Sequence, residues 1–356
     1  MDHEARVAGA AAALEAKGVD ALLVTDRANV RYLTGFSGTN GQVLVTGSGA
    51  VFFTDPRYEA RAGALVQGAR IDVYRDRLTD RLPDHLGAVE RLGIEADTMT
   101  VGERDRLAAR LSGVELASTS GVVEGLRQVK DPEEVALLRD AIALGDEAFD
   151  WVLDRLVPGA TERQIALDLE VHMREQGAES VSFEPIVGSG PLSAHIHHTP
   201  SDRALEKGDL VLLDFGCRKE GYCSDLTRTV VLGAATDEQR AQYELVLRAQ
   251  AAGISAVAPG ATGKGVDASA RSLVEEAGEG DAFGHGLGHG VGLDIHEAPR
   301  LARISEDTLQ AGEVVTIEPG VYHVGTGGIR IEDCVLVTEQ GPEVLGRAPK
   351  DELIEL

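Results

Sequence analysis

Short apolar runs alternate with amphipathic segments through the first third of the chain. The runs at 20–25, 41–47 and 50–55 predict strands, and the helical spacing of apolar residues near 3–17 and 56–67 predicts helices. Residues 31–41, rich in Gly, Ser and Thr, are predicted to form a loop. This mixture predicts a small α/β domain over residues 1–123.

A second section opens with a helix start at Asp131. Asp131 suits the N-cap position, Pro132 suits the first helical position, and two acidic residues follow. Apolar residues then recur on one helical face as far as Leu156, and a Pro-Gly pair at 158–159 is expected to end the helix. We therefore predict a second domain over residues 124–356.

The second domain contains an internal duplication. "PGATERQIALDLEVHMREQG" from residue 158 is repeated as "PGATGKGVDASARSLVEEAG" from residue 259, and "LEKGDLVLLDFG" (205–216) is repeated as "LQAGEVVTIEPG" (309–320). Two copies of a helix–helix–strand–strand unit predict a sheet with pseudo-twofold symmetry, whose equivalent residues meet near the axis. A solenoid would need more repeats.

The duplication aligns polar residues of similar chemistry in pairs: Asp214 with Glu318, His197 with His296 and, less cleanly, Asp225 with Glu332. Asp214, Glu318 and Glu332 each interrupt an apolar strand segment. A buried carboxylate costs several kcal/mol unless a cation compensates it. The pattern therefore favours a metal site, with structural ion pairs as the alternative.

The composition limits the function classes. The chain has 356 residues, with 34 basic and 59 acidic side chains and a net charge of −25, which disfavours binding to nucleic acid or to anionic membranes. A solvated acidic surface accounts for most of these carboxylates. There is no apolar run of about 18 residues and no leader pattern, so we expect a cytoplasmic protein. Three cysteines are too few for a disulfide scaffold.

Residues 284–300, "GHGLGHGVGLDIHEAPR", combine five glycines with three histidines. The glycines alternate, so they fit no G-x-G-x-x-G phosphate loop. We interpret them as positions where the backbone approaches a ligand closely while His285 and His289 project into a site. Carboxylates together with imidazole suit a pair of divalent ions such as Mn²⁺, Co²⁺ or Zn²⁺, which can share bridging carboxylates and activate water.

Four ordered motifs resemble those of the Xaa-Pro peptidases, proline-specific members of the pita-bread metallopeptidases: "DFGCRKEGYCSDLTRT", "GHGLGHGVGLDIHEAP", "TIEPGVY" and "GIRIEDCVLV". The resemblance spans residues 124–356 and extends more weakly into 1–123 through "NVRYLTGFSGTNG" and "FFTDPRY". It implies an α/β (α+β) chain, in which a creatinase-like α/β domain precedes a pita-bread catalytic domain.

The resemblance also implies a dinuclear metal centre with five ligands: Asp214, Asp225, His289, Glu318 and Glu332. Asp225 and Glu332 would bridge two divalent ions, which we expect to be Mn²⁺, with Co²⁺ or Zn²⁺ as alternatives. Asp214 would complete one ion, and His289 with Glu318 the other. Water activated there would attack the carbonyl before proline, with Glu318 carrying the proton to the leaving nitrogen.

Four neighbouring residues match further positions of these peptidases. His197 and His296 match histidines that contact the substrate and its tetrahedral intermediate. His285 matches a position beside the ligands, and Arg330 is expected to orient Glu332. The other histidines of this region, His195, His198 and His323, are predicted to be polar loop residues.

Arg300 bears on the length of the substrate. An arginine four residues after His296 could bind the free carboxylate of an Xaa-Pro dipeptide, as in sequences that resemble prolidases. This favours an Xaa-Pro dipeptidase over an aminopeptidase P, with small proline-containing peptides as substrates and a homodimer implied by the resemblance. A metal-free relative such as creatinase, or a catalytically silent binding protein, would be expected to lose ligands that this chain retains.

Overall fold

The computed structural model describes all residues from Met1 to Leu356. The chain forms two compact units, Met1–Arg127 and Gln128–Leu356. The division falls near the end of α7 (Val123–Gln128), slightly beyond the boundary predicted between residues 123 and 124. No helix combines the length and the apolar character that crossing a membrane requires.

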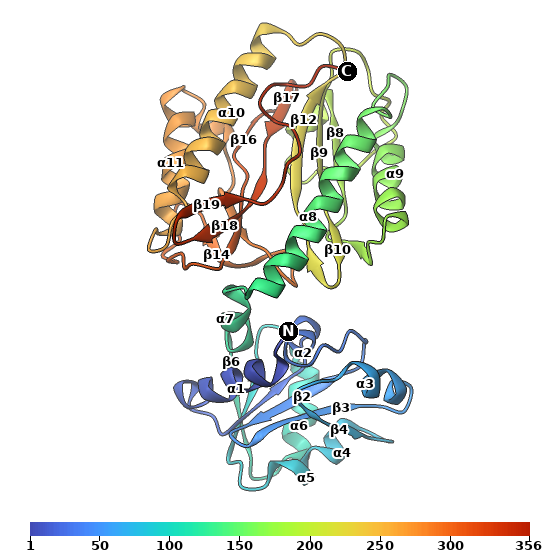
Figure 1. Ribbon diagram of the computed structural model, residues 1–356, viewed down its shortest axis with the longest axis vertical. Helices are drawn as coiled ribbons and strands as arrows, with labels where there is room; N and C mark the ends of the chain where they lie inside the picture. The colour runs from blue at the N-terminus through green and yellow to red at the C-terminus, as the bar shows by residue number, and fades with distance from the viewer. The chain divides into compact units, whose positions relative to one another are not determined.

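The first unit is built on a six-stranded mixed sheet with the strand order β4-β3-β2-β1-β5-β6 (Figure 1). Its strands are β1 (Ala21–Val24), β2 (Gln42–Thr46), β3 (Gly49–Thr54), β4 (Arg70–Val73), β5 (Arg91–Glu95) and β6 (Glu115–Thr119). The pairs β1–β2 and β2–β3 are antiparallel, whereas β3–β4, β1–β5 and β5–β6 are parallel. The three strands predicted from apolar runs are confirmed as β1, β2 and β3.

The helices of the first unit are α1 (His3–Ala13), α2 (Arg27–Thr34), α3 (Glu59–Leu65), α4 (Leu78–Arg81), α5 (Pro83–Leu86) and α6 (Val101–Arg110). The loop predicted over residues 31–41 is partly wrong, because α2 extends to Thr34. The Asp26 carboxylate caps α2 by accepting from the Asn29 N–H at 3.0 Å. Gly35 ends the helix in the left-handed region, with φ at +78°. Asp26 and Gly35 thus set the two ends of α2.

The first half of the second unit opens with α8 (Pro132–Leu153). Its start is as predicted, since Asp131 and Glu134 form a capping box, but it ends before the Pro-Gly pair. The remaining elements of this half are α9 (Glu162–Glu175), β7 (Ser180–Val181), β8 (Ile186–Ser189), β9 (Leu210–Phe215), β10 (Cys217–Lys219), β11 (Tyr222–Cys223) and β12 (Leu226–Val231). The strands form two sheets, ordered β12-β9-β8 and β11-β10-β7.

The second half repeats the helix pair as α10 (Asp237–Ala256) and α11 (Gly263–Glu276). Its strands are β13 (Gly288–Gly290), β14 (Glu297–Leu301), β15 (Val314–Ile317), β16 (Gly320–His323), β17 (Gly327–Arg330), β18 (Asp333–Thr338) and β19 (Gly341–Val344). They form a five-stranded sheet, β14-β13-β15-β18-β19, and a two-stranded sheet, β16-β17.

The duplication predicted from the sequence is present in the fold. In Figure 1, α8 and α9 lie beside β8, β9 and β12, whereas α10 and α11 lie beside the strands of the second half. Each half has its own apolar core, one around Phe149 and Phe215 and the other around Val246 and Val315. The halves join at β12, where the Thr229 hydroxyl donates to the Arg330 carbonyl at 3.1 Å. Strands of the two halves therefore meet along the centre of this unit.

Candidate metal centre

Two equivalent antiparallel strand pairs supply four carboxylates. Asp214 lies on β9, and Asp225 immediately precedes its antiparallel partner β12. Glu318 immediately follows β15, and Glu332 immediately precedes its antiparallel partner β18. The Glu332 N–H donates to the Thr227 carbonyl at 3.1 Å, which joins one strand pair to the other. The duplication thus gathers acidic residues that are more than one hundred positions apart.

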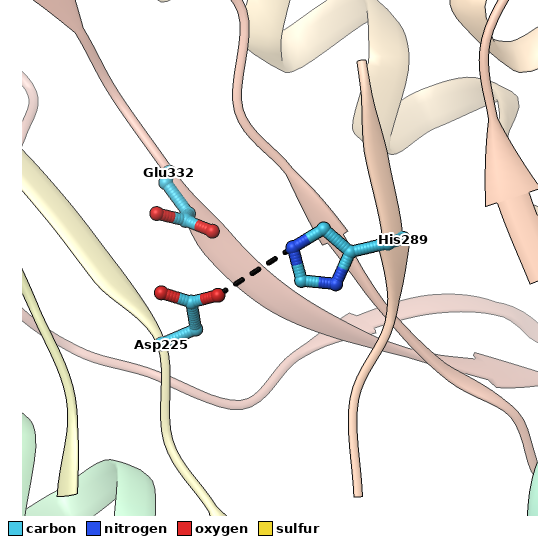
Figure 2. A group of neighbouring side chains, drawn as sticks. All are labelled: Asp225, His289 and Glu332. Atoms are coloured by element: carbon cyan, nitrogen blue, oxygen red, sulfur yellow. Dashed lines mark ion pairs between the residues drawn. The ribbon is translucent and has the colours of Figure 1, made fainter. Parts of the chain in front are cut away.

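Asp225, His289 and Glu332 form the tightest group, with ligand atoms all within 4.8 Å of one another (Figure 2). The His289 Nε2 lies 3.6 Å from the Asp225 Oδ2 and 3.5 Å from the Glu318 Oε1. Asp214 lies outside this group and forms an ion pair with Arg330. It is nevertheless close to it, because Thr227, its cross-strand partner, donates its hydroxyl to the Glu332 Oε2 at 2.6 Å.

The His289 ring is oriented to present a lone pair to this group. Burial lowers the pKa of His289 to about 4, so the ring is neutral near pH 7. Its Nδ1 lies 2.9 Å from the Gly290 carbonyl, which can only accept, so the ring proton resides on Nδ1. The Nε2 that faces Asp225 and Glu318 is therefore an acceptor, as a metal-binding imidazole nitrogen must be.

The carboxylates lack sufficient compensating charge from the protein. Asp225 is 6% exposed, and no residue donates a hydrogen bond to its carboxylate. Burial, and next the charge of Glu332, raise the pKa of Asp225 well above its ordinary value. Burial likewise raises the pKa of Glu332 well above its usual range and that of Glu318 to about 7. Arg330 supplies one positive charge for four acidic groups, so the residues fit one or more bound divalent cations.

Comparison with known proteins identifies the family. Residues 136–339 match metallopeptidase family M24, and residues 6–129 match the creatinase/prolidase N-terminal domain. The chain belongs to metallopeptidase family M24. This confirms the resemblance seen in the sequence and, with it, the creatinase-like first domain and the pita-bread second domain. The family implies divalent metal ions, in agreement with the donor set of the site.

Three relatives show how far the similarity extends. An uncharacterized peptidase of Bacillus subtilis is 42% identical over 95% of this chain and 96% of its own length. The structure of an Xaa-Pro dipeptidase from Bacillus anthracis superimposes with a TM-score of 0.97 at 39% identity and covers 100% of both chains. That of an X-Pro aminopeptidase from Thermotoga maritima gives 0.90 at 34% identity, over 95% of this chain and 98% of the other.

A chain of hydrogen bonds lies beside the carboxylates of this M24 site. The Arg330 Nη1 donates to the Tyr322 hydroxyl at 2.8 Å, and that hydroxyl donates to the His285 Nε2 at 2.9 Å. The His285 Nδ1 lies 2.7 Å from the Gly286 carbonyl, so Nε2 is the acceptor, and burial lowers the pKa of His285 to about 3. His285 is therefore neutral and bound to Tyr322 rather than directed at the carboxylates.

Two residues of this region make contacts that the sequence did not indicate. Arg330, expected to orient Glu332, reaches it through Thr227, because the Arg330 Nε donates to the Thr227 hydroxyl at 3.1 Å, and its guanidinium also binds Asp214 and Tyr322. The Thr227 hydroxyl in turn donates to the Glu332 Oε2 at 2.6 Å. Tyr322 was not predicted at all, because nothing in the sequence separates it from an ordinary apolar strand residue.

Two glycines of the 284–292 run, Gly288 and Gly290, have a different cause from the one inferred. A Cβ atom at Gly288 would lie 1.9 Å from the Thr316 carbonyl oxygen, and one at Gly290 would lie 2.1 Å from the Ala298 carbonyl oxygen. Both glycines therefore allow close approach of neighbouring backbone, and the interpretation that they admit a ligand is wrong. They are essential to the site indirectly, because β13, which carries His289, lies between β14 and β15.

The remaining predicted residues lie around the carboxylates. The His296 ring meets the His289 ring edge-to-face, with centroids 4.5 Å apart. His197 is exposed on the loop after the 3₁₀ turn Gly190–Ala194, and it contributes to the electrostatic environment of Asp214 and His296. His198, expected to be an ordinary loop residue, hydrogen-bonds the buried Glu162 at 2.8 Å.

Arg300 lies directly opposite His289 in the antiparallel pair β13–β14. Directly opposed residues of an antiparallel pair project from the same face of the sheet. The Arg300 side chain therefore lies on the same face of the sheet as His289. The residue is exposed, and its guanidinium makes no ion pair or hydrogen bond within the protein. Its backbone N–H donates to the Asp307 carboxylate at 2.7 Å, which anchors the strand beneath it.

Proposed function

We propose that this M24 metallopeptidase is an Xaa-Pro dipeptidase, which hydrolyses the bond between an N-terminal residue and proline. We further propose that it holds two divalent cations, with Mn²⁺ favoured over Co²⁺ and Zn²⁺, through five ligands: Asp214, Asp225, His289, Glu318 and Glu332. Support comes from the buried and uncompensated carboxylates, from the acceptor nitrogen of His289, and from the similarity to a named Xaa-Pro dipeptidase.

When bound, the cations would lower the pKa of water and polarise the scissile carbonyl. Glu318, whose carboxylate is 3.5 Å from the His289 Nε2, is placed to carry a proton toward the leaving proline nitrogen. His296 and His197 would donate hydrogen bonds to the carbonyl oxygen as negative charge develops on it. The strand pairing that opposes Arg300 to His289 favours a dipeptide, because the free guanidinium can form a bidentate pair with its carboxylate.

Arg300→Ala provides the test of substrate length. We expect KM for an Xaa-Pro dipeptide to rise about 10- to 100-fold, the effect of losing a charge-assisted pair. KM for the corresponding Xaa-Pro-amide should change little, because it has no carboxylate to lose. Steady-state kinetics on both substrates measures the difference.

The matched control for this test is Arg303→Ala. Arg303 is an exposed arginine of the same segment and pairs with Glu275. Its loss should leave both substrates unaffected. Equal effects of Arg300→Ala on dipeptide and amide would reject the carboxylate role.

An Xaa-Pro aminopeptidase is the second candidate, since the Thermotoga maritima aminopeptidase shares the fold over nearly the whole chain. An Xaa-Pro dipeptide and an Xaa-Pro-Xaa tripeptide assayed side by side with Mn²⁺ distinguish the two. Preference for the tripeptide, together with equal effects of Arg300→Ala, would favour the aminopeptidase. Absence of hydrolysis of either peptide by metal-loaded protein would favour a catalytically silent member of the family.

His296→Ala tests whether His296 acts on the substrate rather than on the metal. His296 stacks edge-to-face on His289 without sharing its carboxylate neighbours. We expect both cations to be retained and kcat to fall about 100- to 1,000-fold, as for the loss of one oxyanion donor. Elemental analysis and kinetics of the same sample give both values. Loss of metal from the variant would instead make His296 a ligand.

A further inference from the structure

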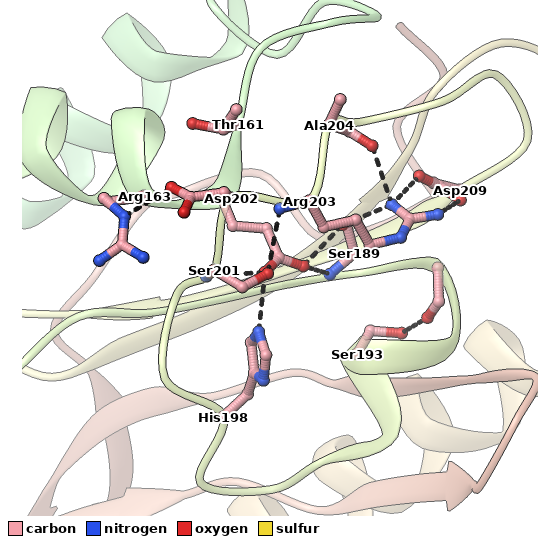
Figure 3. A network of polar contacts seen from close by, with 12 residues as sticks. Thr161, Arg163, Ser189, Ser193, His198, Ser201, Asp202, Arg203, Ala204 and Asp209 are labelled. Carbon is pink, nitrogen blue, oxygen red and sulfur yellow. Dashed lines mark hydrogen bonds and ion pairs between the residues drawn. The ribbon is translucent and has the colours of Figure 1, made fainter.

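Glu162 is a buried carboxylate outside the metal centre that binds an unusual number of donors. It is the first residue of α9 and is 0% exposed. Its Oε1 accepts from the N–H and the hydroxyl of Ser189, at 2.8 and 2.7 Å. Its Oε2 accepts from the His198 Nε2 at 2.8 Å and from the N–H and hydroxyl of Ser201, at 3.0 and 2.6 Å. Figure 3 shows Ser189, His198 and Ser201 gathered in this network.

These five hydrogen bonds keep Glu162 ionised. Burial alone would raise the pKa of Glu162, but the bonds from Ser201, His198 and Ser189 outweigh it, so the pKa lies below its ordinary value. A buried carboxylate with this many donors holds them strongly, because charge-assisted hydrogen bonds are the stronger kind. Loss of its charge would leave several buried donors without a good acceptor.

The residues that donate to Glu162 lie at the ends of one loop, residues 189–201, and within it. Ser189 and Ser201 lie at its two ends, and His198 is the immediate neighbour of His197. His197 itself is exposed and makes no hydrogen bond of its own. The placement of the His197 ring therefore depends on how firmly the surrounding backbone is held, and Glu162 binds that backbone at both ends and beside the histidine.

The second half of the duplication shows that the fold does not itself require this carboxylate. Glu162 is equivalent to Gly263, and both backbone N–H groups donate to the loop that follows, at the Arg203 and Asp307 carbonyls. A Cβ at Gly263 would lie 2.1 Å from the Arg300 carbonyl oxygen. In that half the loop packs directly on the helix start and leaves no room for a side chain.

Both halves nevertheless anchor the residue after the site histidine. Glu297, the equivalent of His198, follows His296 and forms an ion pair with the Lys130 Nζ at 3.0 Å. The side chains of Lys130 and Glu297 are 1% and 8% exposed, so this pair is buried like that of Glu162. In the first half the loop residue His198 donates to Glu162 of α9, whereas in the second half the loop residue Glu297 accepts from Lys130, which precedes α8. The shared feature of the two anchors is the histidine beside them, which indicates that holding this histidine is their role.

We propose that Glu162 is a positioning residue for catalysis, which fixes the 189–201 loop so that His197 meets the substrate in a single orientation. The inference rests on the proposed function, in which His197 contacts the substrate. It assigns a catalytic contribution to a carboxylate that touches neither metal ligand nor substrate.

Glu162→Gln tests the proposal with little change in volume. We expect kcat on an Xaa-Pro dipeptide to fall about 10- to 100-fold with KM and metal content nearly unchanged, because a reacting group displaced by about 1 Å costs rate on this scale. In a His197→Ala background the same substitution should cost nothing further, since the residue that it positions is already absent. Equal losses in both backgrounds would overturn the proposal.

Asp146→Asn is the matched control. Asp146 is a buried carboxylate on α8 that accepts from the N–H groups of Arg347 and Ala348, away from the His197 loop. It should lower the melting temperature as Glu162→Gln does but leave kcat unchanged. Hydrogen exchange separates the two directly: the peptide covering residues 189–205 should exchange faster in Glu162→Gln and at the wild-type rate in Asp146→Asn. Unchanged exchange in Glu162→Gln would contradict the proposal.

A pair of substitutions at His198 supplies the same test if Glu162→Gln folds poorly. His198→Leu removes the donor to Glu162 and should lower kcat, whereas His198→Gln retains an N–H donor and should restore most of it. Equal kcat values for the two variants would overturn the proposal. If His197→Ala alone leaves kcat unchanged, the proposed role of His197 is wrong and the inference falls with it. If His197→Ala lowers kcat while Glu162→Gln does not, only the positioning role is wrong.

Discussion

Removal of divalent cations by a chelator should abolish peptidase activity and lower the melting temperature, and added Mn²⁺ should restore both. Without cations, Asp225 and Glu332 are buried together with no sufficient opposing charge. A cation present at about 100 times its dissociation constant stabilises the folded state by about 2.7 kcal/mol, or on the order of 5 to 10 °C for a unit of this size. Calorimetry with and without Mn²⁺ measures this shift independently of turnover.

Asp225→Asn supplies the control for the thermal measurement. This variant removes one of the acidic groups, so Mn²⁺ should raise its melting temperature much less than that of the wild type. Asp146→Asn, which leaves the site intact, should show the full increase. Full turnover by protein that elemental analysis shows to be free of metal would refute the metal requirement.

The proximity of the carboxylates could be predicted from the sequence because their signal is local and repeated. Asp214 and Glu318 stand out as charges at the ends of apolar strands, and the duplication shows that they are equivalent. Strand pairing then accounts for the position of the other two carboxylates. The β9–β12 pair brings Asp225 near Asp214, and the β15–β18 pair brings Glu332 near Glu318. The pattern of apolar and polar residues along the chain shows directly where these charged positions end or interrupt an apolar strand.

The hydrogen-bond partners of these residues could not be predicted in the same way. The Thr227 hydroxyl contacts Glu332, and the Tyr322 hydroxyl contacts Arg330. Each contact depends on the direction of one side chain in three dimensions. Arg330 illustrates this, since its place beside Glu332 predicted that it orients this residue but not that the contact runs through the Thr227 hydroxyl. In a strand, alternate residues point to opposite faces, and the Arg330 guanidinium also reaches Asp214 on β9.

The cause of Gly288 and Gly290 could not be predicted for a related reason. Glycine indicates that something approaches the backbone closely, but not whether it is a ligand or another strand. At Gly288 and Gly290 the approaching groups are carbonyl oxygens of Thr316 and Ala298. Long-range packing of this kind leaves no periodic signal. Glu162 shows the same limit: at a helix start, an acidic residue would be expected to interact with the helix dipole, whereas its partners lie 27 to 39 positions away.

Asp225→Asn is expected to have the largest effect of any single substitution in the site. The Asp225 carboxylate lies 3.6 Å from the His289 Nε2, groups with Glu332 within 4.8 Å, and has no hydrogen-bond donor. An amide keeps the size of the side chain but lacks the negative charge, and its NH₂ group would meet acceptors on both sides. At least one cation should be lost, and kcat should fall roughly 1,000-fold or more, because several kcal/mol of transition-state stabilisation depend on the bound metal.

The measurement combines metal content per chain with kcat at saturating Mn²⁺, which separates weaker binding from a defect in chemistry. If excess Mn²⁺ restores the stoichiometry but not the rate, Asp225 also orients the reacting groups. Asp146→Asn, measured in parallel, should retain the wild-type metal content and rate, because its carboxylate binds only backbone N–H groups of the C-terminal segment. An Asp225→Asn protein with unchanged metal content and unchanged kcat would remove Asp225 from the centre. The ligand set would then have to be rebuilt around His289 and Glu318, the other close contact observed in the structure.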